Sequence, residues 1–365
     1  MRPERVKYMH IGIIGLPASG KTTVFQALTG ASSQSRRAGG RAETRIVPVP
    51  DARLAAIAAF YRPRKVTPAT ITFIDPTVEG QQGLRYVESL LPLMRNVDAL
   101  AHVVRAFHNP AVPHPAGEID PVRDFRQLND ELLLADLAVV ERRGERLAKD
   151  LKKGKDRTLE EEYALLRRCQ EALEAACPLR RLALSAPERK QLRGFGLLTS
   201  KPQLVVLNLD EGAMAREQTC VEMFISRLHE PDLDVLPLYG KLEQELTQLS
   251  PEEAEAFRRE LGLAYASLDR FVQKCYTLLD LCAFFTANDK EVRAWTIPQG
   301  TPAIRAAGVI HSDMARGFIR AEVVHYDDLI ACGSPAKVRE MGKLRVEGKE
   351  YPVQDGDLLF IRFHV

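Results

Sequence analysis

The sequence contains a segment whose residue types and spacing could bind the phosphates of a nucleotide. It fits the pattern GxxxxGK[ST] and consists of Gly15, Leu16, Pro17, Ala18, Ser19, Gly20, Lys21 and Thr22. In such a loop the glycines permit a tight turn, and backbone N–H groups then face the α- and β-phosphates. Lys21 would reach the β- and γ-phosphates, and the hydroxyl of Thr22 would coordinate Mg²⁺. We expect the next residue, Thr23, to complete the binding segment.

Two further positions could supply the metal and base contacts of a nucleotide site. Asp75 ends the apolar run 71–75 and could hold Mg²⁺. Asn208, Leu209 and Glu211 end another apolar run, where GTPases carry the pattern N-K-x-D. The Asp of that pattern accepts two hydrogen bonds from guanine, and the longer Glu211 side chain spoils this fit. Because a site that loses this paired contact loses its main discrimination against adenine, the sequence predicts ATP over GTP.

The elements around these residues predict how they are positioned. Residues 9–14 form a short apolar run, and 21–29 read as the start of a helix, so the phosphate loop has a strand before it and a helix after it. Further candidate buried strands are 71–75, 99–105, 204–208 and 234–238. Helical stretches such as 85–95 lie between them. This alternation predicts an α/β fold with a parallel, doubly wound sheet.

A charged, helical region interrupts this alternation. It extends from about Asp124 to residue 198, with leucines at mixed three- and four-residue spacings on either side of Gly154. The pattern predicts an antiparallel helical hairpin, a coiled coil, inserted between two strands. Its bend, Lys149–Arg157, is basic. This bend is either a solvated tip or a contact to the phosphates of a nucleic acid.

The last part of the sequence predicts a separate α+β domain. Candidate strands are 291–297, 318–324, 343–346 and 358–363, with one helix near 302–308 and a turn at Gly356. We therefore expect four segments. They are the first part of a nucleotide-binding domain (9–123), the helical insert (124–198), the second part of the nucleotide-binding domain (199–281) and the C-terminal domain (282–365).

Composition indicates a globular protein of the usual kind. Hydrophobic residues make up 45% and charged residues 27%, and the net charge of +2 neither indicates nor excludes a nucleic-acid partner. No run approaches the ~20 apolar residues of a membrane span, and the charged first residues do not resemble a signal peptide. We expect a cytoplasmic monomer that does not enter a membrane.

Several segments together resemble the YchF-type proteins of the Obg family, also called Obg-like ATPases. They include GLPASGKTTVFQALTG, VPVPDARL, RNVDALAHVVRAF, EVRAWTIPQGT and GKEYPVQDGDLLFIRF. The resemblance covers about Met9 to Val365 and is most specific in the C-terminal block. It implies a Ras-like P-loop domain with a helical-hairpin insert and a C-terminal TGS-type (ubiquitin-like) β-grasp domain. Such domains are associated with ribosome or RNA binding. The resemblance also implies a preference for ATP, with Gly240 and Lys241 supporting the base.

The sequence departs from that family at its nucleotide-sensing positions. Ala18 replaces an Asn that related GTPases use with a monovalent cation, so potassium dependence is open. The switch pattern D-x-x-G reads Asp75-Pro76-Thr77-Val78, without its Gly, and Gly80 stands two residues further on. Gly39 stands where the first switch normally has a Thr, and Thr44 is the nearest alternative. Tyr239 replaces the Ser of the base loop.

Altered switches beside intact nucleotide-binding residues leave three functions open. The first is a slow, Mg²⁺-dependent ATPase that acts as a ribosome-associated switch, with Lys21 as the catalytic residue. The second is a nucleotide-gated binding module with little or no hydrolysis. The third is a conventional GTP-binding protein. If the base-site argument for ATP is right, Glu211→Asp, ideally with Leu209→Lys, should raise the affinity for GTP. Whether the protein is an enzyme therefore stays open at this point.

Overall fold

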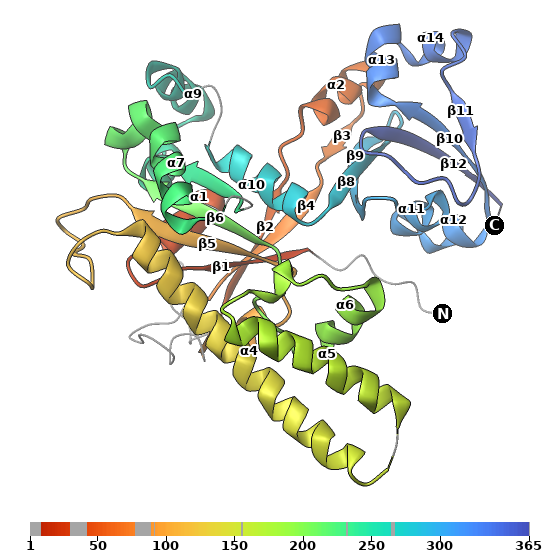
Figure 1. Cartoon of the computed structure of the whole chain (residues 1–365). Helices are drawn as coiled ribbons and strands as arrows, with labels where there is room; N and C mark the ends of the chain where they lie inside the picture. Colours follow the sequence, from red (N-terminus) through yellow and green to blue (C-terminus); the bar gives the residue numbers. More distant parts are fainter. Residues whose placement is uncertain are drawn as a thin grey trace. The chain divides into compact units, whose positions relative to one another are not determined.

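The computed structural model describes residues 9–29, 42–76, 89–90, 92–154, 156–230, 233–263 and 267–364 (Figure 1). The chain divides into two compact units. One unit comprises His10–Arg45 and Phe73–Phe271, and the other comprises Met1–Met9, Ile46–Thr72 and Val272–Val365. Within the described residues, no helix has both the length and the apolar character needed to span a membrane.

A six-stranded sheet in the order β2-β4-β1-β5-β6-β7 carries the first unit. Its strands are β1 (His10–Ile14), β2 (Glu43–Pro48), β4 (Thr70–Asp75), β5 (Ala99–Ala106), β6 (Gln203–Leu209) and β7 (Val235–Leu238). β1, β5, β6 and β7 pair in parallel. These strands are apolar runs because helices cover both faces of such a sheet. The predicted α/β sheet is confirmed. Its four parallel strands end at one edge, where ligand sites form in folds of this kind.

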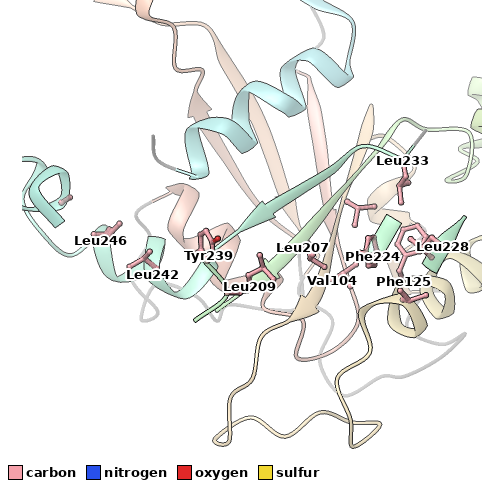
Figure 2. Packing of buried hydrophobic residues seen from close by; sticks show 14 residues of the cluster. Val104, Phe125, Leu207, Leu209, Phe224, Leu228, Leu233, Tyr239, Leu242 and Leu246 are labelled. Carbon is pink, nitrogen blue, oxygen red and sulfur yellow. The ribbon is translucent and has the colours of Figure 1, made fainter. Parts of the chain in front are cut away.

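Helices flank this sheet, and all of them except α1 contribute to one buried apolar cluster that packs on it. They are α1 (Lys21–Thr29), α7 (Glu217–Leu228), α8 (Gly240–Leu246), α9 (Pro251–Glu260) and the 3-10 helix η4 (Glu211–Arg216). α10 (Ser267–Leu278) leads from the first unit into the second along the chain. Leu207 of β6, Phe224 of α7 and Leu242 of α8 belong to the same cluster (Figure 2). This packing fixes the ends of β6 and β7, which carry the predicted base site.

The predicted helical hairpin is confirmed. It consists of α4 (Pro121–Leu151) and α5 (Arg157–Glu174), followed by η2 (Leu179–Arg181), α6 (Ala186–Leu192) and η3 (Arg193–Phe195). Asp120 caps α4 by accepting hydrogen bonds from the backbone N–H groups of Val122 and Arg123. Leucines of both helices form a core of their own. The fully buried carboxylate of Asp136 accepts backbone hydrogen bonds from Leu198 and Thr199 and so fastens the hairpin to the chain that follows it.

The second unit contains a six-stranded sheet in the order β11-β10-β12-β8-β9-β3. Its strands are β3 (Lys65–Thr67), β8 (Leu281–Ala287), β9 (Glu291–Pro298), β10 (Phe318–His325), β11 (Arg345–Glu347) and β12 (Asp357–Phe363). Its helices are α2 (Ala52–Tyr61), α11 (Ala303–Ile310), α12 (Ser312–Arg316), α13 (Tyr326–Cys332) and α14 (Pro335–Glu340). β8 and β12 are adjacent and parallel, with antiparallel β9 and β10 outside them. With α11 packed in the core of this sheet, the arrangement is the expected β-grasp.

The segment between β2 and β4 contributes to the second unit. β3 pairs in parallel with β9, with Lys65 opposite Glu291. At the base of the segment, the Val49 N–H donates to the Ala69 carbonyl at 2.8 Å. The sequence analysis assigned this segment to the first part of the nucleotide-binding domain (9–123). β3 pairs with β9, which is distant in the sequence, and no pattern in the residues around β3 indicates this pairing.

Candidate functional site

The phosphate loop lies between β1 and α1, and its shape depends on two glycines. A Cβ on Gly15 would lie 2.4 Å from the Val103 carbonyl oxygen, and a Cβ on Gly20 would lie 2.3 Å from the Asn208 amide nitrogen. Gly20 also has a φ of +86°, which side chains disfavour. The Ser19 N–H donates to the Leu16 carbonyl at 3.2 Å and closes the turn. Larger residues at either glycine would push the loop away from the sheet.

Lys21, Thr22 and Asp75 lie together beside this loop. The Thr22 hydroxyl donates to the Asp75 carboxylate at 3.4 Å, and Lys21 Nζ lies 3.4 Å from the Leu16 carbonyl oxygen. Burial lowers the pKa of Lys21, and the negative charge of Asp75 opposes this shift. Thr23 follows in the first turn of α1. The structure thus brings together the lysine predicted to bind phosphates and both predicted Mg²⁺ ligands.

The ligand types at this site fit Mg²⁺. In the described part of the chain, no group of three or more His, Cys, Asp or Glu side chains could hold a metal ion. Mg²⁺ usually takes only one or two protein oxygens and completes its octahedron with water and phosphate oxygens. Thr22 at the start of α1 and Asp75 at the end of β4 could provide two such oxygens, close to where bound phosphates would lie.

Asn208 joins the phosphate loop to the loop before α8. It is 3% exposed. Its amide nitrogen donates to the Ser19 carbonyl at 3.1 Å, and its amide oxygen accepts from the Gly240 N–H at 3.0 Å. A Cβ on Gly240 would lie 3.0 Å from that oxygen, so the close approach favours glycine. The structure therefore gives Asn208 a bridging role in addition to the predicted contact with the purine.

The other predicted base residues differ in exposure. Leu209 is 3% exposed and packs in the apolar cluster that also contains Tyr239 (Figure 2). Glu211 is exposed at the start of η4, and Lys241 is exposed and pairs with Glu245 one turn later on α8. Glu211 is therefore the predicted base residue whose carboxylate can reach a ligand without repacking the core.

Tyr239 supports the loop that carries Gly240. Its hydroxyl donates to Glu217 Oε2 at 2.7 Å, and Glu217 also pairs with Arg270 at 3.5 Å. Burial raises the pKa of Tyr239, and the bond to Glu217 raises it further. The hydroxyl thus stays protonated and keeps donating. A Ser at this position could not reach as far into the cluster.

Only part of each switch region lies within the residues that the structure describes. Thr44 lies on β2 with an exposed side chain. Asp75 and Pro76 are described, whereas Gly39, Thr77, Val78 and Gly80 lie outside the described residues. The expectations attached to those four positions therefore stay predictions.

Sequence reasoning missed two residues beside the phosphate loop. Arg105, near the end of β5, is 2% exposed and donates to the Ala18 carbonyl. His114 Nε2 lies 2.7 Å from the Asp124 carboxylate, and both side chains line a small cavity behind the loop together with Ser19. The signal for Arg105 was an arginine within the apolar run 99–105, since arginine is seldom buried without a partner. Nothing local distinguished His114.

Comparisons with known proteins show which family the chain resembles. The family model YchF-GTPase_C, described as "Protein of unknown function (DUF933)", matches residues 281–364. The chain is 40% identical over 364 residues to the "Ribosome-binding ATPase YchF" of Bacillus subtilis, covering 97% of this chain and 99% of that protein. It is 38% identical over 360 residues to the protein of the same name from Escherichia coli O157:H7, with the same coverage.

Solved structures show the same relationship. The "Schizosaccharomyces pombe YchF GTPase" superimposes with a TM-score of 0.85 at 31% identity, covering 97% of this chain and 98% of that one. A "GTP binding protein from Pyrococcus horikoshii OT3" has a TM-score of 0.62 at 18% identity, covering 98% and 100%, which is a likeness of fold alone. Because full-length relatives exceed 30% identity and share both the sheet that carries the phosphate loop and the β-grasp unit, the chain belongs to the YchF family.

Proposed function

We propose that this protein binds a purine nucleotide with Mg²⁺ and hydrolyses it slowly. The observation that carries the proposal is the meeting of Thr22 and Asp75, 3.4 Å apart, beside the partly buried Lys21. Mg²⁺ supplies neutralisation of the phosphate charge when it is bound. The Lys21 ammonium group and the N–H groups at the start of α1 stabilise the charge that develops on the transferred phosphoryl group. Water is the nucleophile.

The proposed nucleotide is ATP, with GTP as the weaker ligand. The support is Glu211, which is exposed at the start of η4 and carries its carboxylate one methylene further out than an Asp would. Asn208, Leu209, Gly240 and Lys241 complete the proposed base site. The bacterial relatives are called ATPases and the S. pombe protein a GTPase, so this choice rests on the base site of this chain.

The proposed partner is the ribosome, bound through the β-grasp domain and the helical hairpin. The support is the name of the bacterial relatives, "Ribosome-binding ATPase". The bend of the hairpin adds exposed basic residues, including Lys152 and Lys153. Positive groups at such a tip fit a surface of RNA phosphates. We propose that the protein acts there as a cytoplasmic monomer.

Hydrolysis can be tested in a single turnover. Excess protein would be mixed with γ-labelled ATP and Mg²⁺, with and without ribosomes, and released phosphate counted. We expect slow release that Lys21→Ala removes, because the charge on the phosphoryl group then lacks its ammonium partner. Lys190→Ala changes an exposed lysine on α6 and is the matched control. Equal release from the Lys21 variant and the control would contradict the proposal.

A nucleotide-gated binding module is the second candidate. It is favoured by the sequence Asp75-Pro76-Thr77-Val78, which lacks the glycine of the D-x-x-G switch. This reading expects ATP to bind and to change ribosome co-sedimentation, without phosphate release above background. Any release that depends on Lys21 in the single-turnover experiment excludes it.

A further inference from the structure

Arg105 is a buried arginine whose position needs a reason. It is 2% exposed, on the strand that follows the phosphate-loop strand in the sheet. Within the described ranges, no Asp or Glu forms an ion pair or hydrogen bond with its guanidinium group. The negative charge of Asp124, which lines the same cavity, acts on the guanidinium only from a distance. Burying a charge without a directly bound carboxylate is costly, so its burial at this position points to a role for the guanidinium.

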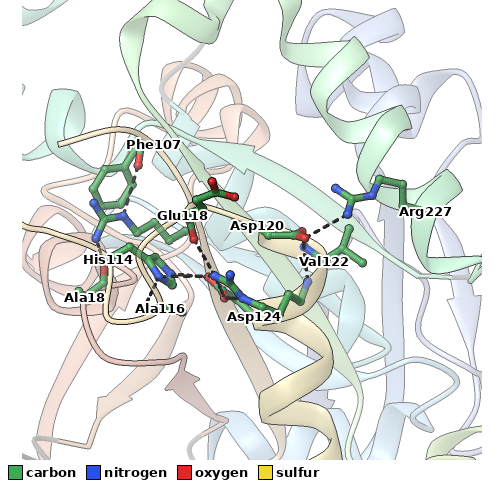
Figure 3. Close-up of polar contacts among 11 residues, drawn as sticks. Ala18, Phe107, His114, Ala116, Glu118, Asp120, Val122, Asp124 and Arg227 are labelled. Atoms are coloured by element: carbon green, nitrogen blue, oxygen red, sulfur yellow. Dashed lines mark hydrogen bonds and ion pairs between the residues drawn. The ribbon is translucent and has the colours of Figure 1, made fainter. Parts of the chain in front are cut away.

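The guanidinium group of Arg105 donates to three backbone carbonyls. Nη2 reaches the Val112 oxygen at 2.7 Å, Nε reaches the Phe107 oxygen at 3.3 Å and Nη1 reaches the Ala18 oxygen at 3.5 Å. The group also lies over the Phe107 ring, 4.6 Å from its centre. Phe107 and Val112 belong to the loop after β5, whereas Ala18 belongs to the phosphate loop. Figure 3 shows Phe107 and Ala18. Arg105 therefore connects these two loops.

The loop after β5 offers Arg105 a firm support. His114 Nε2 lies 2.7 Å from Asp124 Oδ2, and these side chains are 6% and 5% exposed. Arg123 donates to the other oxygen of the same carboxylate at 2.9 Å and to the Glu118 carbonyl at 2.8 Å. Asp124 lies in the first turn of α4 (Figure 3). The Val112 carbonyl accepts the shortest hydrogen bond of Arg105. It therefore belongs to a loop that is held to the start of the hairpin by these contacts.

The backbone conformation of Ala18 indicates what Arg105 could contribute. Its φ is +63°, a left-handed conformation that L side chains rarely adopt. Asn and Asp tolerate this region because their side chains bond locally, but alanine has no such group. Some other contact must therefore hold this peptide. The Arg105 bond to the Ala18 carbonyl is positioned to do so.

We propose that Arg105 is a positioning residue for the nucleotide. By holding the Ala18 carbonyl on the side of the β5–α4 loop, it keeps the phosphate loop in the conformation that binds phosphates. The inference rests on the proposed function of this loop. The Arg105 side chain would thus stabilise the left-handed backbone conformation of Ala18, which alanine disfavours.

The proposal predicts that the need for Arg105 depends on the residue at position 18. Arg105→Gln should weaken ATP and ADP binding about tenfold, the equivalent of one charged hydrogen bond. Arg105→Lys keeps the charge but lacks the three-way fork, so its affinity should fall between those of the wild type and Arg105→Gln. In an Ala18→Gly background, glycine adopts the left-handed conformation without help, so Arg105→Gln should cost only about twofold to threefold.

The test is a double-mutant cycle in the full-length protein, read by calorimetric titration with ADP and with ATP plus Mg²⁺. The proteins are the wild type, Arg105→Gln, Ala18→Gly, the double variant and Arg105→Lys in both backgrounds. Arg227→Gln is the matched control, since Arg227 reaches Asp120 at the other end of the same loop and is 56% exposed. Thermal unfolding of each variant checks that it is folded. If Arg105→Gln does not fold, the cycle with Arg105→Lys takes its place.

Each outcome separates the possibilities. A smaller cost of changing Arg105 in the Ala18→Gly background supports the proposal, because a purely structural role in the 107–112 loop would not depend on residue 18. Equal costs in both backgrounds, or unchanged affinity in Arg105→Gln, overturn it. If the wild type binds neither ADP nor ATP, the proposed function itself fails, which is a different result from binding without coupling.

Discussion

Asn208 is the residue on which two loops of the nucleotide site depend. Asn208→Ala would leave the Ser19 carbonyl and the Gly240 N–H without their side-chain partner in a buried place. We expect the variant to lose about 2–4 kcal/mol of unfolding free energy and to bind ATP at least about tenfold more weakly. Denaturant unfolding and an ATP titration measure both. Wild-type stability together with weak binding would show that Asn208 contacts only the nucleotide.

Glu211 and Leu209 are not equally open to exchange. Glu211 is exposed, whereas Leu209 is 3% exposed within the core. The Leu209→Lys exchange suggested by the sequence would bury an ammonium group among apolar side chains and cost several kcal/mol. Glu211→Asp alone is therefore the better test. It should raise the affinity for GTP relative to ATP by about tenfold, and competition between the two nucleotides would reveal no change if the base-site argument is wrong.

His102 should make the stability of the first unit depend on pH. Burial, together with the positive charge of nearby Arg180, lowers its pKa from 6.5 to about 3. The unfolded chain therefore binds a proton that the folded chain rejects, so this contribution is complete above pH 6.5 and is lost as the pH falls toward 3. We expect about 2 kcal/mol less unfolding free energy at pH 5 than at pH 7 from this group. Denaturation of His102→Gln should show a correspondingly weaker pH dependence, and an unchanged one would contradict the assignment.

At the scale of elements, α2 is fastened by one arginine at its start. Arg53 donates to both carboxylate oxygens of Asp51 and of Asp355, with distances of 2.9 Å to Asp51 Oδ1 and 2.7 Å to Asp355 Oδ2. It also lies over the Phe285 ring. Arg53→Ala should lower the stability of the β-grasp unit by about 2 kcal/mol, reduced from the value for a fully buried pair because the side chain is partly exposed.

The matched control for this helix is Arg64→Ala. Arg64 is exposed in the same segment, and we expect a change within about 0.5 kcal/mol. Hydrogen exchange at β8 and β12 reports the stability of this unit separately from the first. Equal exchange in the two variants would mean that the Arg53 cluster contributes nothing to the attachment of α2.

Elements with strong local signals could be predicted from the sequence. β1, β5 and β6 are largely apolar runs, and the leucine spacing of α4 and α5 indicated a hairpin. β3 could not be predicted in its place. It has three residues, and it becomes a strand only by pairing with β9, which is distant in sequence. Tertiary pairing of this kind leaves no periodic trace in the segment itself.

For the molecule as a whole, the candidate site also has parts with a local sequence signal and parts that depend on tertiary contacts. The phosphate loop was predictable because its chemistry is local and its residues are contiguous. The bridge made by Asn208 and the contact between Arg105 and Ala18 were not, since each depends on how β5 and β6 place a side chain against a distant loop. The need for glycine at positions 15, 20 and 240 can be explained only from the structure, which shows the atoms that a Cβ would contact there.

The central claim is that this YchF-family protein binds ATP at the loop between β1 and α1. The most direct measurement is calorimetric titration of the nucleotide-free protein with ATP and with GTP in Mg²⁺, repeated with Thr22→Ala. We expect saturable binding that is tighter for ATP and that weakens in Thr22→Ala only when Mg²⁺ is present, because Thr22 acts through the ion. Tighter GTP binding, or ATP binding in Mg²⁺ that Thr22→Ala leaves unchanged, would contradict the account.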